Sequence, residues 1–155
     1  MRIGVISDTH GYLDPRAAVA LQGVARILHA GDIGSPAIID ALEAIAPVDA
    51  VHGNVDIGTP LARRFPGSRQ ILIEEVLIHI THIGGQPAAL VRALPQPRPN
   101  VYIFGHSHVA LLETLSGVLF LNPGAAGRSR FGGGLSVAIL DIQAGQAMAR
   151  IVPLA

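Results

Sequence analysis

The sequence contains no cysteine among its 155 residues. Disulfide bonds, thiolate metal ligands and cysteine nucleophiles are therefore excluded, and the redox compartment stays undetermined. Lysine is also absent, so all basic residues are arginine, and the 11 of them balance 11 acidic residues to a formal net charge of zero. This balance gives no indication of a nucleic-acid-binding surface or of an acidic membrane as a partner.

Long hydrophobic runs are missing as well. Asp8 interrupts the short apolar run of the opening MRIGVISDTH, which is too short for a signal peptide or for a spanning helix of about 20 residues. We therefore expect a cytoplasmic protein with no membrane association. Half of the residues are hydrophobic and only 14% are charged, which favours buried strands over a helical bundle. The length suits a single domain over residues 1–155.

The first half of the chain alternates between apolar runs and capped helices. Strands are expected at 2–7, 25–30 and 48–52, and helices at 14–23 and from residue 35 onward. Asp14 and Ser35 each precede a proline, which is typical of a helix start. The alternation predicts parallel strands with right-handed crossovers, whose carboxyl ends share one edge. Ligands of open α/β sheets bind at that edge.

The second half changes to strands joined by glycine-containing turns. Strands are expected at 70–73, 76–81, 101–104, 110–114, 118–121, 135–142 and 147–152, with a short helix at 87–94. Parallel strands followed by hairpins predict two mixed sheets packed face to face with helices outside. The expected fold is a single-domain four-layer αββα sandwich.

Polar side chains follow the ends of the expected strands. They are Asp8, His10, Asp32, Asn54, His82, His106 and His108. Carboxylate, imidazole and amide groups suit manganese, iron, zinc, nickel or cobalt better than calcium. Seven ligands are too many for one tetrahedral ion, but they suit two ions bridged by a carboxylate and a water. Asp32 is the natural bridge, since a carboxylate can give one oxygen to each ion.

Each of these residues also has an ordinary structural interpretation. Asp8 with Gly11, the Gly31–Gly34 segment and Asn54 fit simple turns, and single histidines are often surface or carbonyl-bonded residues. His106 and His108 are more specific, because they flank one serine and share one side of an extended segment. The metal hypothesis rests on all seven residues falling at strand ends.

The other histidines and a nearby aspartate are interpreted as structural. His29 and His52 lie inside apolar strands just before candidate ligands and are able to orient them. His79 alternates within its strand. Asp56 is expected to support the ligands from outside the site.

The blocks SDTHG, AGD, GN, a strand-end histidine and GHSH occur in this order over residues 7–108, followed by LNPGAAGRSR at 121–130. They resemble the calcineurin-like metallophosphoesterase superfamily, and within it the small phosphodiesterases of the YfcE/MJ0936 type. The resemblance implies that one metal binds Asp8, His10, Asp32 and His108. The other would bind Asp32, Asn54, His82 and His106, with Asn54 also contacting a phosphate oxygen.

The implied function is a dinuclear metal-dependent phosphodiesterase, with manganese as the first expected metal. A hydroxide between the two ions would attack phosphorus in line, while the metals and Asn54 hold the phosphate oxygens. Arg128 and Arg130 are candidates for a phosphate contact, and a solvated loop arginine is the alternative for each. Many larger family members carry a general-acid histidine after the asparagine; here that position is Val55. Hydrolysis is therefore expected to need a good leaving group such as a phenolate.

Two other functions remain open. A non-catalytic scaffold, like the retromer subunit with this fold, would act through protein partners; a phosphomonoesterase would differ only in substrate. The absence of lysine and the neutral balance favour diesters, which carry one charge fewer. Residues 82–85 read HIGG, where many relatives have His-Gly-His. Gly84 stands in place of the second histidine, so a possible contact to the substrate or to a ligand is lost. Without a long insertion the site should be shallow and open, and the oligomeric state stays open, a homo-oligomer included.

Overall fold

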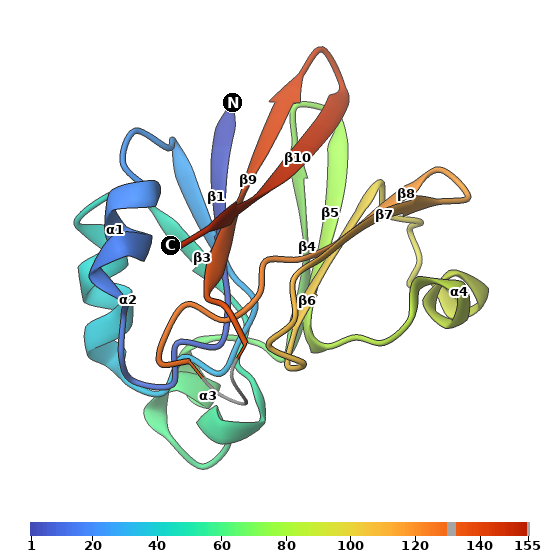
Figure 1. The fold of residues 1–155 in the computed structure, drawn as a ribbon. Helices are drawn as coiled ribbons and strands as arrows, with labels where there is room; N and C mark the ends of the chain where they lie inside the picture. Colours follow the sequence, from blue (N-terminus) through green and yellow to red (C-terminus); the bar gives the residue numbers. More distant parts are fainter. Residues whose placement is uncertain (130–132, 155) are drawn as a thin grey trace.

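The protein forms two five-stranded mixed sheets that pack face to face (Figure 1). The computed structural model describes residues 1–129 and 133–154. The strands are β1 (Arg2–Ile6), β2 (Arg26–His29), β3 (Val48–Ala50), β4 (Ser68–Ile73), β5 (Val76–Ile83), β6 (Val101–Gly105), β7 (Leu111–Leu115), β8 (Val118–Asn122), β9 (Ser136–Gln143) and β10 (Gln146–Pro153). The helices are α1 (Pro15–Ala20), α2 (Pro36–Glu43), α3 (Pro60–Arg64) and α4 (Pro87–Leu90), with 3-10 turns η1 (Asn54–Asp56) and η2 (Val91–Ala93).

The first sheet has the order β10-β9-β1-β2-β3. Its β1, β2 and β3 are parallel, as the strand–helix alternation predicts, and β9 and β10 add to it antiparallel. Helices α1 and α2 cover the outer face of this sheet (Figure 1). Both begin at the expected caps, where Asp14 and Ser35 accept hydrogen bonds from backbone N–H groups of the first turn.

The second sheet has the order β4-β5-β6-β8-β7. Strands β5, β6 and β8 are parallel to one another, and β4 and β7 form antiparallel edges. Helix α4 lies beyond the outer face of this sheet (Figure 1).

Three clusters of buried side chains fill the three interfaces of a four-layer sandwich. The first lies between the helices and the first sheet and includes Ile6 and Leu42. The second lies between the sheets and includes Val5 and Ile78, and the third includes Phe120 packed with Leu90 of α4. Val5 and Ile6 enter different clusters because successive side chains of a strand point to opposite faces. The expected αββα architecture is therefore confirmed.

The ten expected strands are all present, each within two residues of its expected bounds. Two expectations differ at short elements. The helix expected at 87–94 is split into α4 and the 3-10 turn η2, and neither η1 nor α3 was expected. No helix in the described residues is long and apolar enough to cross a membrane.

Candidate metal centre

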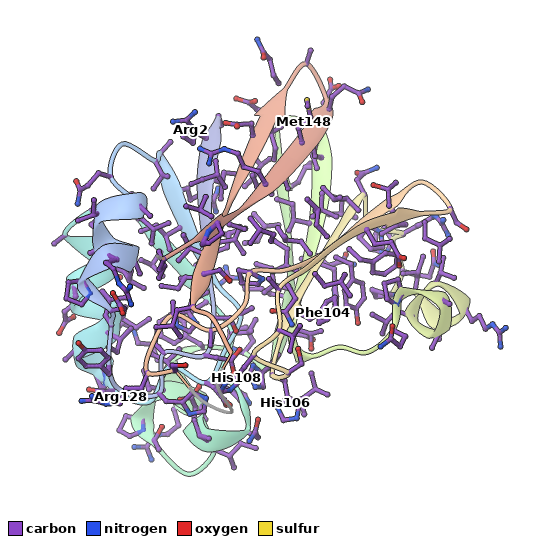
Figure 2. The ribbon with its side chains drawn as sticks, in the orientation of Figure 1. Arg2, Phe104, His106, His108, Arg128 and Met148 are labelled. Carbon is purple, nitrogen blue, oxygen red and sulfur yellow. The ribbon has the colours of Figure 1, made fainter. Side chains whose placement is uncertain are left out.

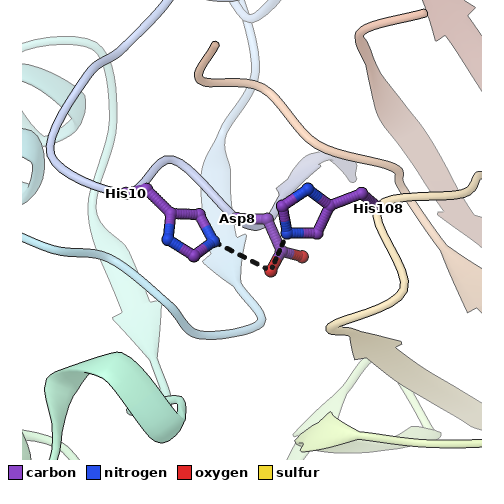
Figure 3. A group of neighbouring side chains, drawn as sticks. All are labelled: Asp8, His10 and His108. Carbon is purple, nitrogen blue, oxygen red and sulfur yellow. Dashed lines mark ion pairs between the residues drawn. The ribbon is translucent and has the colours of Figure 1, made fainter. Parts of the chain in front are cut away.

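Two groups of three candidate ligands meet at the carboxyl ends of strands from both sheets. The first group consists of Asp8, after β1, with His10 and His108 (Figure 3). Asp8 Oδ1 lies 3.6 Å from His10 Nε2 and 3.3 Å from His108 Nε2. One ligand atom from each residue lies within 4.8 Å of the other two, which is the spacing of groups around one ion.

The second group consists of Asp32, His82 and His106. Asp32 follows β2, His82 is the buried penultimate residue of β5, and the exposed His106 follows β6. His82 Nε2 lies 3.1 Å from Asp32 Oδ2, and the His82 and His106 rings are 5.2 Å apart. The family resemblance divides these six residues between two metals in the same way, and their binding of metal stays a prediction.

The carboxylate of Asp32 connects the two groups. Its Oδ2 lies 3.4 Å from His10 Nε2 as well as 3.1 Å from His82 Nε2. Its Oδ1 accepts a hydrogen bond of 3.0 Å from the Val55 amide. Asp32 Oδ2 therefore faces both groups, while Asp32 Oδ1 is engaged by the backbone of Val55. The bridging role suggested for Asp32, with one oxygen for each ion, stays a prediction.

Asn54 and Arg128 lie at different edges of this centre. Asn54 is exposed at the start of η1 and lines a hollow of about 200 Å³ together with His82. The guanidinium of Arg128 instead lies 4.2 Å from the ring centroid of Tyr12, on the side of the site toward α1 and α2 (Figure 2). Asn54 is thus beside the second group, whereas Arg128 stacks on a ring. Arg130 lies outside the described residues.

The tautomer of His82 tests whether a cation fits between His82 and Asp32 within the second group. His82 Nδ1 lies 2.8 Å from the Ala30 carbonyl, to which it donates. In the neutral ring Nε2 then carries a lone pair, which faces the Asp32 carboxylate at 3.1 Å. Two lone pairs at this distance repel each other unless a proton or a metal ion lies between them.

Other buried atoms point to the same requirement. Asp8 Oδ1, His10 Nε2 and His82 Nε2 are buried without an aligned hydrogen bond among the described residues. Buried polar atoms without partners are rare and costly in folded proteins. Two divalent ions coordinated by these atoms would satisfy them, so the residues present fit the expected cofactors.

The pKa values in the metal-free centre reflect the same contact. Burial alone would lower the pKa of His82, but Asp32, the Ala30 carbonyl and the charge of Asp8 together raise it. Burial alone would raise the pKa of Asp32, but His82 and the Val55 amide lower it. Both shifts show that the contact between His82 and Asp32 favours positive charge on the imidazole and negative charge on the carboxylate.

The backbone at the site is unusual in a way that the sequence did not reveal. Five candidate ligands have positive φ angles: Asp8 (54°), His10 (48°), Asp32 (55°), His106 (72°) and His108 (63°). Left-handed backbone costs free energy in residues other than glycine and is concentrated at functional sites. The folded structure thus holds these side chains in a conformation that local preference disfavours.

Hydrogen bonds to Asp8 fix the orientation of its carboxylate. Ser7 Oγ donates to Asp8 Oδ2 at 2.7 Å, and the His106 amide donates to the same oxygen at 3.0 Å. The other oxygen is left facing His10 and His108. Ser7 was not among the site residues predicted from the sequence, although a serine directly before a candidate ligand aspartate is a usable signal.

Asp56 connects the loop that carries Asp32 with the loop that carries Asn54. Its buried carboxylate accepts hydrogen bonds from the amides of Ile33 (3.1 Å), Gly34 (2.9 Å) and Gly53 (2.8 Å). The first two follow Asp32 and the third precedes Asn54. A Cβ at Gly53 would overlap the Asp32 side chain, so this approach requires glycine. Asp56 has the supporting position expected of it.

Two other histidines, His29 and His52, contact segments around the site. His29 Nε2 lies 3.0 Å from Thr9 Oγ1, and its Nδ1 accepts from the Gly31 amide at 3.1 Å. His29 therefore positions the segments that carry Asp8 and Asp32, and burial lowers its pKa to about 3. His52 does not orient a ligand side chain as suggested; its Nδ1 donates to the Phe65 carbonyl at 2.8 Å, because the chain after α3 passes beside it.

Comparison with known proteins agrees with this geometry. The calcineurin-like phosphoesterase superfamily domain matches residues 1–145, so the chain belongs to this superfamily. The chain is 36% identical over 140 residues to a probable metallophosphoesterase of Methanothermobacter thermautotrophicus, covering 81% of this chain and 77% of that protein. It is 29% identical over 139 residues to phosphodiesterase MJ0936 of Methanocaldococcus jannaschii, covering 80% of this chain and 83% of that protein.

Solved structures share the fold. A structure described as a novel archaeal phosphodiesterase superposes with a TM-score of 0.78 at 26% identity, covering 98% of this chain and all of the other. Vps29 of Chaetomium thermophilum superposes with a TM-score of 0.80 at 19% identity, covering 99% of this chain and 96% of the other. At that identity the likeness to Vps29 concerns the fold alone.

Proposed function

We propose that the protein is a dinuclear metal-dependent phosphodiesterase that hydrolyses phosphodiesters with good leaving groups. The observation that carries the proposal is the pair of ligand groups joined through Asp32 Oδ2. Similarity to a phosphodiesterase of Methanocaldococcus jannaschii supports the substrate class.

The chain's own residues have distinct roles in this proposal. Asp8, His10 and His108 hold one ion, His82, His106 and Asn54 hold the other, and Asp32 joins the two sites. When bound, the two ions activate the attacking water and neutralise negative charge on the phosphate. Manganese is the metal we propose first, with iron, zinc, nickel and cobalt as alternatives that the same donor set accommodates.

Substrate contacts in the proposal come from the edges of the centre. The exposed Asn54 amide is free to donate to a phosphate oxygen from the second group. Arg128 is a weaker candidate, because a phosphate contact would require its guanidinium to leave the Tyr12 ring. We therefore expect substitution of Asp32 to reduce turnover most. Substitution of Asn54 should reduce it less, and substitution of Arg128 least.

The side chain that follows Asn54 cannot donate a proton to the leaving group. Val55 is 42% exposed there, and its side chain cannot transfer a proton. General acid catalysis typically contributes about 10²–10⁴-fold. The enzyme is accordingly proposed to act on esters of acidic alcohols such as phenols, whose oxygen leaves without protonation.

Hydrolysis of bis(4-nitrophenyl) phosphate and of 4-nitrophenyl phosphate by the manganese-loaded protein tests the proposal. The diester is expected to react faster, and Asp32→Ala is expected to abolish the activity while leaving a folded protein. Faster hydrolysis of the monoester would replace the proposal by a phosphomonoesterase. No hydrolysis of either ester with any divalent ion would favour a scaffold that acts through protein partners.

A further inference from the structure

A hollow of about 370 Å³ opens beside His106, and its size lies within the range of small-molecule sites. Its walls come from the end of β5 and the loop after it, from the end of β6, and from the start of β7. The residues that matter for the argument are Ile83, Gly84, Phe104, His106, Val109 and Leu111. We call this hollow the apolar recess. Figure 2 shows Phe104 and His106 on the same side of the centre, away from Arg128.

The floor of the apolar recess is the ring of Phe104. Phe104 is only 4% exposed and belongs to the cluster of buried side chains beneath α4. A Cβ at Gly84 would overlap this ring, so glycine at position 84 keeps side-chain atoms off the aromatic face. The departure from His-Gly-His therefore removes a polar side chain and lets the backbone at Gly84 pack directly against an apolar ring.

Two polar residues of the walls, Asn122 and Ser107, are engaged with one another and with the backbone. Asn122 Nδ2 donates to the Gly105 carbonyl and to Ser107 Oγ, each at 3.1 Å. Asn122 Oδ1 accepts from the Gly124 amide at 2.9 Å. Among the described residues that line the recess, none is aspartate, glutamate or arginine, and His106 is the single ionisable group. A charged group entering the recess would lose part of its hydration and meet no carboxylate or guanidinium.

The mouth of the recess is formed by exposed hydrophobic side chains. Ile83 is 57% exposed and Val109 is 66% exposed, and each directly follows a candidate metal ligand. Covering them with an apolar group would stabilise a complex by roughly 25 cal/mol per Å² of apolar surface removed from water. Their position fits a ligand that extends from the metal centre across His106.

We propose that the apolar recess binds an uncharged apolar substituent, aryl or branched alkyl, of a phosphodiester whose phosphate lies at the metal centre. This inference rests on the proposed function and adds to it the class of ester group. The recess favours esters in which one substituent is apolar, and it disfavours substrates that carry a second phosphate at this position.

The test compares methyl phenylphosphonate with methyl methylphosphonate, binding to the manganese-loaded protein by calorimetry. Both are monoanions like a phosphodiester, and their methoxide group leaves too poorly for turnover to interfere. Partial burial of a phenyl ring predicts about tenfold tighter binding of the phenyl compound. In Val109→Asn and in Leu111→Asn the preference should fall below about threefold, while methyl methylphosphonate binds as to the wild type.

Ile57→Asn provides the matched control. Ile57 is 67% exposed and lines the hollow of about 200 Å³ beside Asn54, outside the apolar recess. It is expected to keep the preference of the wild type. Val109 is exposed, so its variant tests the proposal even if Leu111→Asn fails to fold. Equal affinities of the wild type for the two compounds would contradict the apolar recess and leave the phosphodiesterase proposal standing. Binding of neither compound would contradict both.

Discussion

The imidazole of His82 faces the carboxylate of Asp32, with 3.1 Å between Nε2 and Oδ2. The Ala30 carbonyl holds the Nδ1 proton on the opposite side of the ring. The Nε2 lone pair and the carboxylate therefore create a site that only a cation or a proton stabilises. This contact is the core of the proposed second metal site.

Removing His82 should selectively weaken metal binding. His82→Gln is expected to lower manganese affinity at one of two sites by roughly 100-fold or more. Loss of a residue that only hydrogen-bonds a metal ligand typically costs about 10–100-fold in affinity, and loss of the ligand itself should cost at least as much. His79→Gln is the matched control, because His79 lies on the other face of β5 with its ring 5.0 Å from Tyr102. Calorimetric titration of both variants measures the effect, and equal affinities would contradict the assignment of His82.

Asp56 is expected to contribute strongly to stability. In Asp56→Asn the amide group would face backbone donors, and loss of charge-assisted hydrogen bonds should cost roughly 2–3 kcal/mol of unfolding free energy. Asp40→Asn, at an exposed position of α2, should change it by less than about 0.5 kcal/mol. Urea denaturation of the metal-free proteins measures both. Similar stabilities of the two variants would show that Asp56 does not fasten the ligand loops.

Val55→His restores a proton donor beside Asn54. We expect up to about 10²-fold faster hydrolysis of dialkyl diesters, which lose a poor alkoxide leaving group, and little change for nitrophenyl esters. The exposed position tolerates the larger side chain. Val55→Gln, which adds polarity without a transferable proton, should leave both rates near those of the wild type. If wild-type enzyme already cleaves alkyl and aryl esters at comparable rates, another residue donates the proton.

His29 should make the metal-free protein less stable as the pH falls. Its folded pKa is about 3, whereas an unfolded histidine titrates near 6.5. Between these values the unfolded state binds a proton that the folded state does not, so stability is lost as pH falls through this window. His29→Gln should reduce the slope near pH 5 by up to about 1.4 kcal/mol per pH unit.

The control for this prediction is Thr9→Val, which removes the hydroxyl at 3.0 Å from His29 Nε2 but keeps the titrating ring. It should lower stability at every pH and retain the wild-type slope. Urea denaturation between pH 4.5 and 7.5 in the presence of a chelator supplies the data. An unchanged slope in His29→Gln would contradict the proton linkage.

The sequence predicted that the candidate ligands gather at one edge, because apolar strands end where polar residues begin. Asp8 follows a continuous run of buried residues, and the rule for parallel strands places such ends at one edge. Helix α3 was missed although Thr59 precedes a proline, as Asp14 and Ser35 do. Five residues are too few to show helical periodicity, so the cap at Thr59 is the single sequence signal for this helix.

Other features depend on contacts that no local pattern encodes. The left-handed backbone of His106 and His108 is imposed by the surrounding structure, not by local preference. The single Asp32 oxygen shared by both groups depends on the Val55 amide, 23 positions away. The apolar recess requires Gly84 and Phe104 to meet across two strands. Tertiary placement determines each of these features.

The most direct test of the dinuclear site measures the number of bound metal ions and the rate of hydrolysis in the same sample. Metal-free protein is titrated with Mn²⁺ while free Mn²⁺ is measured by electron paramagnetic resonance and bis(4-nitrophenyl) phosphate hydrolysis is followed. About two ions are expected to bind per chain, and activity should reach its maximum only as the second site fills. Full activity with one ion, or two bound ions without hydrolysis, would contradict this expectation.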